Sequence, residues 1–365
     1  MTEVRIKQTL AAYESKYVKR ELPVLTQKQE LIQLDRNENN YGPSSQVATA
    51  ILDELSNLSQ YTDVEAQPLR RALAQYFDLE NDQILVTNGS FDLISLIASV
   101  YQNAGHTALT CAPTFDWYRV ATVVNGGDLL ELPLTAAHGF DLEAIRQAIT
   151  PQTDIIWICN PNNPTGTFLA HQELETFLAQ VPKNILVVLD EAYIEYANSH
   201  DASDSLKFIK TYPNVILLRT FSKVHGLASL RIGYGMANPQ IIHQLFGLKV
   251  PPNMNRLSLQ AATASLADIE HTQKIIALNA GQRANFYKVL AKHGLEVIPS
   301  QTNFILVNFK TETAPIVAAL KAKGILVRGG AEYGYPNWIR LTIGKAEEND
   351  AFFRQLNRLS SQNMF

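Results

Sequence analysis

Five short apolar runs in the first two thirds of the chain constrain its fold more than any other feature. They occupy residues 83–87, 108–111, 155–159, 185–189 and 215–218. The run at 185–189 is continuously apolar, as expected for a strand buried on both faces of a parallel sheet. Segments with helical periodicity lie between the runs, for example residues 92–100. This alternation predicts an α/β fold in which helices flank a mostly parallel central sheet.

The length of 365 residues permits two domains. We expect residues 45–245, which carry the alternation, to form the larger one. A Pro-Pro break at 251–252 and a long helical stretch follow, and then predicted strands at 304–307 and 339–343 alternate with a helix at 314–323. Residues 246–365, joined by residues 1–44 with an N-terminal arm, are expected to form a smaller α+β domain that closes over the site.

Polar side chains follow three of the predicted strands. Asn-Pro-Asn-Asn-Pro-Thr-Gly follows residue 159, Asp190 to Tyr193 follow residue 189, and Arg-Thr-Phe-Ser-Lys follows residue 218. Taken alone, the first segment is an ordinary turn and a single lysine is usually solvated. Ligands of open α/β sheets, however, bind at the carboxyl ends of the strands. Three such ends in succession predict a site that contains Asp190 and Lys223.

The residues around Lys223 suit a phosphate-bearing aldehyde cofactor. A lysine that forms a Schiff base needs a fixed position, and a phosphate needs hydroxyls and a cation beside it. Thr220 and Ser222 offer the hydroxyls, and Arg231 offers the cation. Gly89 precedes the predicted helix at 92–100, and a helix N-terminus is a ready anion site. Alone, the Asn-Gly-Ser sequence at Gly89 is an ordinary turn.

Seven sequence motifs distributed over the chain form a combined pattern. They are LDRNENNYGPS at 34–44, YTDVEAQPLR at 61–70, NPNNPTG at 160–166, LDEAYIEY at 189–196, RTFSK at 219–223, LRIGYG at 230–235 and WIRLTIG at 338–344. Together they resemble the fold-type I aminotransferases that use pyridoxal 5'-phosphate, and among these the histidinol-phosphate aminotransferases. The resemblance extends over nearly the whole chain. It implies transamination between histidinol phosphate and 2-oxoglutarate by a ping-pong mechanism, through a Schiff base on Lys223.

The resemblance also implies roles for individual residues around the cofactor ring. Lys223 would hold the cofactor and move a proton at the substrate α-carbon, and Asp190 would pair with the pyridinium nitrogen. Asn163 and Tyr193 would donate hydrogen bonds to the phenolic oxygen, and Phe115 would stack on the ring. The phosphate would be held by Thr220, Ser222 and Arg231 with the backbone amides of Gly89, Ser90 and Phe91.

Substrate recognition and assembly follow from the same resemblance. Arg340, with Asn163 nearby, is expected to bind the substrate α-carboxylate by a bidentate contact. Arg328 is a candidate for a second substrate anion, which matters if the substrate carries a phosphate. Tyr61 matches a tyrosine that reaches the cofactor phosphate of the neighbouring subunit, so a homodimer with composite active sites is expected.

Alternatives with the same fold and cofactor remain open. A threonine-phosphate decarboxylase and an aromatic or other amino-acid aminotransferase would show much of the same pattern. Two departures concern the side chain of the amino donor: residues 17–23 lack the glycine of an aromatic-Pro-Gly pattern, and residues 252–255 lack an aromatic before the Asn. A nucleotide-binding α/β enzyme is disfavoured, because the sequence contains neither G-x-G-x-x-G nor a P-loop motif.

Composition narrows the function further. A net charge of −4 argues against a nucleic-acid partner. Cys111 and Cys159 both lie in apolar runs and are expected to be core residues in a reducing cytoplasm. The eight His and two Cys show no metal-ligand spacing. No run approaches the roughly 18 apolar residues of a membrane span, and no apolar signal region is present near Met1, so we expect neither secretion nor membrane insertion.

Overall fold

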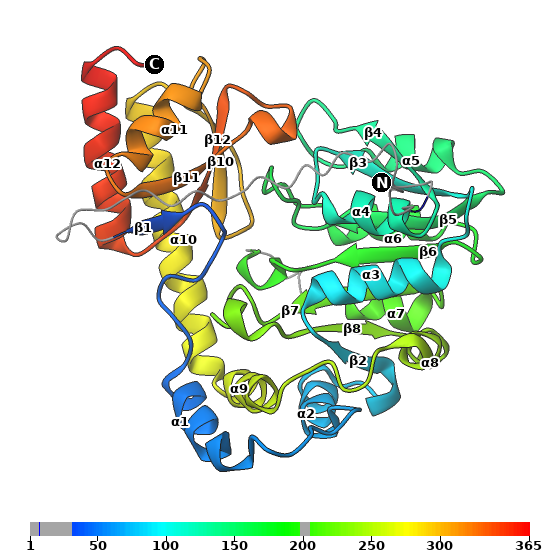
Figure 1. Ribbon diagram of the computed structural model, residues 1–365. Helices are drawn as coiled ribbons and strands as arrows, with labels where there is room; N and C mark the ends of the chain where they lie inside the picture. Colours follow the sequence, from blue (N-terminus) through cyan, green and yellow to red (C-terminus); the bar gives the residue numbers. More distant parts are fainter. Residues whose placement is uncertain (1–6, 8–30, 198–204) are drawn as a thin grey trace, which may run out of the picture.

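The computed structural model describes residue 7, residues 31–197 and residues 205–365. Two sheets organise these residues (Figure 1). The larger sheet has seven strands in the order β2-β8-β7-β6-β5-β3-β4. In that order the strands are Ile84–Thr87, Gly233–Ala237, Val215–Thr220, Leu186–Asp190, Thr153–Cys159, Thr107–Ala112 and Asp128–Pro133. Strand β8 alone runs opposite in direction to the other six strands of this sheet, which confirms the predicted α/β fold with a mostly parallel sheet.

All five strands predicted from apolar runs are present, and the sheet adds two that the runs did not reveal. Strand β8 reads Gly-Tyr-Gly-Met-Ala, so two glycines mask its apolar character, although all five residues are buried. Strand β4 lies at the sheet edge and has no buried residue. A half-solvated edge strand does not need the continuous apolar run of a central strand.

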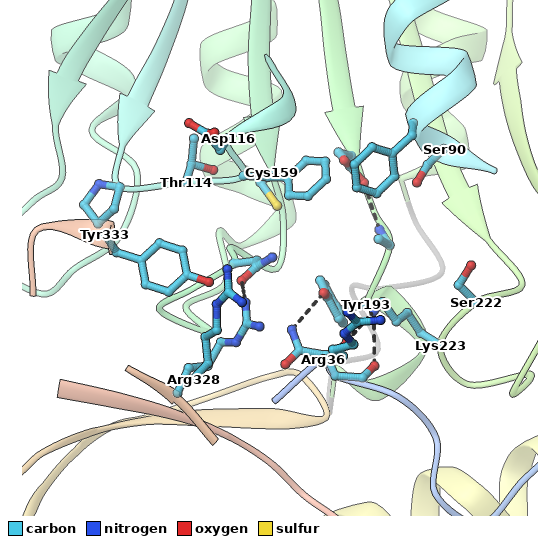
Figure 2. A pocket seen from close by; sticks show the side chains of 18 of the residues that line it. Arg36, Ser90, Thr114, Asp116, Cys159, Tyr193, Ser222, Lys223, Arg328 and Tyr333 are labelled. Carbon is cyan, nitrogen blue, oxygen red and sulfur yellow. Dashed lines mark hydrogen bonds between the residues drawn. The ribbon is translucent and has the colours of Figure 1, made fainter. Parts of the chain in front are cut away.

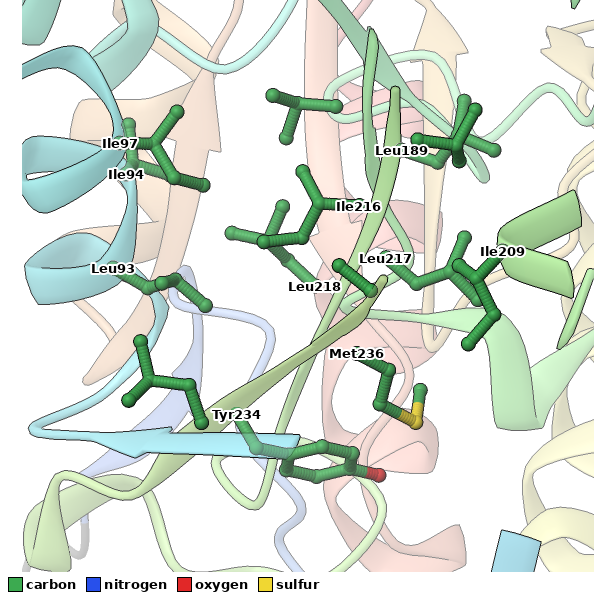
Figure 3. Close-up of a cluster of buried hydrophobic side chains, with 14 of the residues drawn as sticks. Leu93, Ile94, Ile97, Leu189, Ile209, Ile216, Leu217, Leu218, Tyr234 and Met236 are labelled. Carbon is green, nitrogen blue, oxygen red and sulfur yellow. The ribbon is translucent and has the colours of Figure 1, made fainter. Parts of the chain in front are cut away.

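The core of the larger domain lies on both faces of this sheet. Every residue of β6 and β7 is buried. Successive side chains of a strand point to opposite faces, and Figure 3 shows Ile216 on the side of Leu93 and Leu217 on the side of Ile209. Burial on both faces fixes the direction of β6 and β7 and therefore the position of the polar residues that follow them.

Helices cover the two faces and the lower edge of the sheet in Figure 1. Helix α3 packs on β7 and β8, and α7 packs on β7 from the other side. Helix α9 packs against α1 and α2. The helices of this part are α1 Ser45–Glu54, α2 Gln67–Phe77, α3 Ser90–Tyr101, α4 Trp117–Val124, α5 Leu142–Ala148, α6 His171–Leu178, α7 Leu206–Thr211, α8 Pro239–Leu248 and α9 Arg256–Ala267.

The smaller sheet has five strands in the order β1-β11-β12-β10-β9. In that order they are Ile32–Leu34, Ile325–Gly329, Trp338–Thr342, Phe304–Asn308 and Glu296–Ile298. Three helices accompany it: α10 Ile269–Lys292, α11 Ala314–Lys321 and α12 Ala346–Ser361. Strand β1 pairs in parallel with β11, so the segment that precedes the large domain joins strands from near the C-terminus. This mixed sheet with its helices is the predicted smaller α+β part.

The division of the chain at residue 246 stays a prediction. Hydrophobic residues of α9, such as Leu259 and Leu266, belong to the larger core, whereas Phe286 and Leu290 of α10 belong to the smaller one. This packing favours a boundary between α9 and α10. Most of the expected N-terminal arm, including residues 17–23, lies outside the described residues.

Candidate active site

A cavity of about 880 Å³ opens where the carboxyl ends of β3, β5, β6 and β7 face the smaller sheet. The large sheet lines it with residues such as Thr114, Cys159, Asp190 and Lys223. The other wall is formed by the segment 35–38 after β1 and by residues of β11 and β12. Figure 2 shows side chains from both walls pointing toward this space. Tight packing of β5, β6 and β7 explains why three separate sequence motifs meet here.

Lys223 reaches across the cavity toward the smaller domain. Its Nζ donates to the carbonyl oxygens of Asn37 at 3.1 Å and Arg36 at 3.3 Å. The same nitrogen lies 5.4 Å from the centre of the Tyr193 ring. Burial, together with the positive charge of Arg340, lowers the pKa of the Lys223 amine to about 7. Near neutral pH a large share of this amine is therefore unprotonated and able to act as a nucleophile.

Asp190 is a buried carboxylate whose position is fixed by two donors. Its Oδ2 accepts from the Tyr118 hydroxyl at 2.8 Å, and its Oδ1 accepts from the backbone N–H of Ala192 at 3.2 Å. Burial raises the pKa of Asp190 to about 6, against the lowering effect of these hydrogen bonds. The group therefore remains mainly ionised at neutral pH, in a place where a cationic partner would be stabilised.

Tyr193 and Asn163 connect the two walls of the cavity. The Tyr193 hydroxyl accepts from Asn37 Nδ2 at 3.0 Å, and burial raises the pKa of Tyr193 above its ordinary value. The Asn163 Oδ1 accepts from Arg340 Nη1 at 2.6 Å. These contacts join the ends of β5 and β6 to Asn37, which follows β1, and to Arg340 of β12.

The predicted phosphate residues converge at the N-terminus of α3. Gly89 has φ +84 and ψ 165, a backbone conformation found almost only in glycine. A Cβ at Gly89 would lie 2.4 Å from Arg231 Nη2, so the guanidinium lies directly against this turn. Arg231 Nη1 donates to Ser222 Oγ at 3.2 Å. Backbone N–H groups, a helix N-terminus and a guanidinium thus gather as an anion site requires.

The other residues predicted to hold the phosphate also line the cavity, and one of them forms hydrogen bonds within its own loop as well. Ser90, Phe91, Thr220 and Ser222 line the cavity together with Arg231. The Thr220 hydroxyl donates to the Ile232 carbonyl oxygen at 3.3 Å and accepts from the Ser222 N–H at 3.1 Å, so it also shapes the loop. Burial lowers the pKa of Arg231.

Aromatic side chains form one side of the cavity. Phe115 lines it and packs edge-on against Phe91, with ring centres 5.0 Å apart. Phe115 also packs edge-on against Tyr118 at 5.5 Å. Phe115 is thereby held between two rings, in a position that suits stacking on a flat ligand.

The two arginines predicted for substrate binding have different partners. Arg340 is buried, and its Nη2 donates to the Asp35 carbonyl oxygen at 2.9 Å. Its Nε has no hydrogen-bond partner among the described residues. Arg328 instead forms a bidentate ion pair with Glu332, in which Nη2 donates to Oε2 at 2.6 Å. Arg340 thus keeps a buried donor for an anion, whereas Arg328 is already paired with the Glu332 carboxylate.

Tyr61 is not brought to this cavity. Its side chain is 88% exposed, and it does not belong to the lining residues. Its backbone carbonyl accepts from Arg256 Nη2 at 3.0 Å, which fixes the loop that carries it. Within one chain Tyr61 therefore makes no contribution to the site, and its predicted role in a neighbouring subunit stays a prediction.

Sequence reasoning assigned no role to several residues of the site. Asn37 lies in the motif at 34–44, and in the structure it has a positive φ of 56, a region that Asn tolerates. The sequence offered only the residue type as a signal. Tyr118 and Tyr333 read as ordinary core aromatics. Glu332 lies four residues after Arg328, a spacing that permits an ion pair without requiring it.

Other features of the described residues bear on function. Cys111 and Cys159 are free and buried, as predicted for core residues. In the part of the chain that the structure describes, no group of His, Cys, Asp or Glu could hold a metal ion. None of the described helices has the length and apolar character needed to cross a membrane.

Comparison with known proteins identifies the family. The family model for aminotransferase class I and II matches residues 29–356. The histidinol-phosphate aminotransferase of Bacillus velezensis is 39% identical over 322 residues, which cover 88% of this chain and 89% of the relative. The crystal structure of histidinol-phosphate aminotransferase from Sinorhizobium meliloti in complex with pyridoxal-5'-phosphate has a TM-score of 0.85 and 28% identity, over 91% of each chain.

A decarboxylase of the same fold is also among the structural neighbours. L-threonine-O-3-phosphate decarboxylase from Porphyromonas gingivalis has a TM-score of 0.80 at 24% identity and covers 91% of this chain and 100% of its own. At that identity the likeness concerns the fold alone. The match to the family model covers most of the chain, and the site residues lie within it: this protein belongs to the aminotransferase class I and II family.

Proposed function

We propose that this chain is a pyridoxal 5'-phosphate-dependent aminotransferase that transfers the amino group of histidinol phosphate to 2-oxoglutarate. The observation that carries the proposal is the position of the Lys223 amine, across from Arg340 and beside Asp190 in one cavity. Relatives that share 37–40% identity over most of this chain are histidinol-phosphate aminotransferases.

The residues of the cavity fit this cofactor at three points. The turn at Gly89 lets the Arg231 guanidinium lie directly against the start of α3, where a Cβ would collide with it. Asp190 offers a fixed buried carboxylate for a protonated ring nitrogen. Lys223 offers an amine with a lowered pKa for the aldehyde. Phosphate, ring nitrogen and aldehyde carbon are the three features by which such a cofactor is recognised.

When bound, pyridoxal 5'-phosphate supplies an electron sink for the bond that breaks at the substrate α-carbon. The chain supplies the proton transfer and the orientation. Lys223 holds the proton that moves at the α-carbon, because its lowered pKa lets it act as base and as acid near neutral pH. An ionised Asp190 would favour the protonated, positively charged form of the ring nitrogen. Asn163 and Tyr193 present polar groups to the phenolic oxygen.

Arg340 is the residue that we assign to the substrate anion. Its guanidinium is held at both Nη atoms, by Asn163 and the Asp35 carbonyl, and its buried Nε lacks a partner among the described residues. An unpaired buried donor is costly, so an anion that accepts from Nε is stabilised. The α-carboxylate predicted for Arg340 exists in 2-oxoglutarate but not in histidinol phosphate. In a ping-pong reaction the anion would therefore be the phosphate of histidinol phosphate in one half and the α-carboxylate of 2-oxoglutarate in the other.

Arg328 is the second arginine of the cavity that a substrate anion could contact. Arg328 lines the cavity, and Glu332 neutralises it through two hydrogen bonds. A substrate phosphate can use Arg328 only by sharing it with Glu332 or by displacing that carboxylate. Arg328 therefore acts as a secondary contact, and Arg340 as the primary one.

We also propose that the functional unit is a homodimer located in the cytoplasm. Tyr61 is 88% exposed and is therefore accessible to a second copy of the chain. Two buried free cysteines suit a reducing compartment. Mixing Lys223→Ala subunits with Tyr61→Phe subunits tests the composite site: mixed dimers should regain one intact site, whereas activity that equals the mean of the two parents would contradict shared sites.

The substrate is tested by a half-reaction measured by absorbance. The loaded protein is mixed in turn with histidinol phosphate, phosphothreonine, phenylalanine, tyrosine and leucine. Conversion to the pyridoxamine form with histidinol phosphate, at a much higher kcat/KM than with the others, is expected. Preferred conversion with phenylalanine, tyrosine or leucine would make the protein a different aminotransferase. Release of carbon dioxide from phosphothreonine without conversion would make it a decarboxylase.

Arg340→Gln is the matched variant for the substrate assignment. It keeps the hydrogen-bonding capacity toward Asn163 but loses the charge. Removing one partner of a buried charge contact costs about 2–5 kcal/mol, so kcat/KM should fall by roughly 30-fold or more. A normal kcat/KM would contradict the role of Arg340, without bearing on the cofactor.

A further inference from the structure

The Asp190 carboxylate accepts a hydrogen bond from Tyr118, a residue outside the seven sequence motifs. Tyr118 lies on α4 and is 0% exposed. Its hydroxyl donates to Asp190 Oδ2 at 2.8 Å. The other oxygen, Oδ1, accepts from the Ala192 N–H. Asp190 therefore has one fixed donor on each oxygen, one from the side chain of α4 and one from its own loop.

Tyr118 has little freedom to move. Its ring is stacked on Trp157 of β5, with centres 5.2 Å apart and planes within 8°. Its edge contacts Phe115, with centres 5.5 Å apart. One side chain thus braces both the carboxylate proposed for the ring nitrogen and the aromatic proposed to cover the ring. A shift of Tyr118 would disturb both at once.

The Tyr118 hydroxyl is also a permanent donor. Burial, with the charge of Asp190, raises the pKa of Tyr118 well above its ordinary value, so the proton stays on the hydroxyl at every working pH. Burial raises the pKa of Asp190, and the hydrogen bond from Tyr118 opposes that rise. The ionisable groups that interact electrostatically with Asp190 come from α4, β5 and the segments after β6 and β7. They are Tyr118, Cys159, Glu191, Tyr193 and Lys223.

We infer that Tyr118 is a positioning residue, which through its hydrogen bond keeps Asp190 ionised and aimed at the cofactor ring nitrogen. This inference rests on the proposed function, because it assumes that pyridoxal 5'-phosphate is the cofactor. Without the hydroxyl, the carboxylate is more basic and holds the shared proton more strongly. The ring nitrogen then loses part of its positive charge, and the ring becomes a weaker electron sink.

The direct test is nitrogen NMR of the protein loaded with cofactor that carries ¹⁵N at the ring nitrogen. In the wild-type protein the signal should lie at the position of a protonated pyridinium. In Tyr118→Phe it should move toward the position of a neutral pyridine. Tyr101→Phe is the matched control, since its hydroxyl also donates a hydrogen bond, at 2.6 Å to Gln244, but outside the cavity. The control should leave the signal in place.

Kinetics with a second cofactor separate this role from a purely structural one. The half-reaction of Tyr118→Phe should be slower by about 10- to 100-fold, the range expected for a lost hydrogen bond to a charged group. With deazapyridoxal 5'-phosphate, which has carbon in place of the ring nitrogen, wild type and variant should react at equal rates. Equal slowing with both cofactors would overturn the inference, because the ring nitrogen would then not be involved.

The outcomes distinguish this inference from the proposed function. If the wild-type protein gives no signal from bound cofactor, both fail. If wild type gives a pyridinium signal and Tyr118→Phe gives the same one, the role of Tyr118 alone is refuted. Should Tyr118→Phe not fold, 3-fluorotyrosine at position 118 provides the second variant. Its more acidic hydroxyl is a stronger donor, so the signal should stay fully at the pyridinium position and the pH at which it is lost should rise; an unchanged pH profile would refute the inference.

Discussion

Gly89→Ala is the substitution whose effect the structure predicts in most detail. The added Cβ would lie 2.4 Å from Arg231 Nη2 and 3.0 Å from Cζ. Non-bonded heavy atoms prefer about 3.5 Å or more, so the guanidinium must retreat by about 1 Å. It then leaves the anion site at the start of α3. The backbone conformation at Gly89 adds strain of about 1–3 kcal/mol for any residue other than glycine.

The expected loss of affinity follows from one charged contact. A hydrogen bond to a charged group contributes about 1.5–3 kcal/mol, which corresponds to roughly 10- to 150-fold in the dissociation constant. Pyridoxamine 5'-phosphate is the suitable ligand, because it carries the phosphate and forms no bond to Lys223. Its binding can be followed by protein fluorescence, and unfolding in urea reports the backbone strain separately.

Gly105→Ala is the matched control for this experiment. Gly105 also has a positive φ of 77, but a Cβ there would meet no atom within 4 Å. It should lower the free energy of unfolding by about 1 kcal/mol and leave the affinity for pyridoxamine 5'-phosphate unchanged. If Gly89→Ala binds this ligand as tightly as the wild type does, Arg231 and the turn at Gly89 do not form the phosphate site.

Three further perturbations follow from the geometry. Because the pKa of Lys223 is lowered to about 7, its neutral amine prevails above that pH. The rate at which the cofactor-free protein reacts with pyridoxal 5'-phosphate should therefore rise up to about pH 7 and then level off. A rise that continues toward pH 10 would indicate a lysine with an ordinary pKa. Glu332→Gln removes the negative partner of Arg328, so inorganic phosphate should inhibit the half-reaction at a roughly two- to fivefold lower concentration. Weaker inhibition would mean that Glu332 holds Arg328 in its binding position. Arg219→Met leaves the Glu191 carboxylate buried without its partner at 2.9 Å, so urea unfolding should show a loss of about 3–5 kcal/mol, and an unchanged midpoint would refute the importance of this pair.

The central part of the site could be predicted because sequence period and strand direction are local properties. The apolar run before Asp190 and the one before Thr220 are continuous, so they indicate central strands whose carboxyl ends must meet. Gly89 and the predicted helix that follows it also indicated an anion site from local sequence. Lys223, Asp190 and Arg231 were therefore predicted as neighbours from sequence, and the structure places all three on the same cavity.

The contacts between the two domains could not be predicted in this way. Asn37 and Arg340 precede and follow the large domain in sequence, and they meet Tyr193 and Asn163 only through packing of the smaller sheet. The partner of Arg328 was equally hidden, since a carboxylate four residues away can be solvated or paired. No periodicity reports which side chain of an amphipathic helix reaches a buried carboxylate.

Tyr118 illustrates that last limit. In the sequence it is an aromatic among apolar neighbours, and burial alone explains such a residue. Its hydroxyl gains a role because β6 ends at Asp190 directly opposite α4. The strand β8 was missed for a different reason, since its two glycines lower its apolar content while neighbouring strands and α3 still bury it.

Mapping the attachment point of the cofactor tests directly whether this cavity is the active site. The protein is incubated with pyridoxal 5'-phosphate, reduced with borohydride, digested and analysed by mass spectrometry. We expect a stable phosphopyridoxyl label on the peptide that contains Lys223, and no label at that site in Lys223→Ala. A label that is confined to other lysines, or that is distributed equally over many of them, would contradict the assignment of this cavity as the active site.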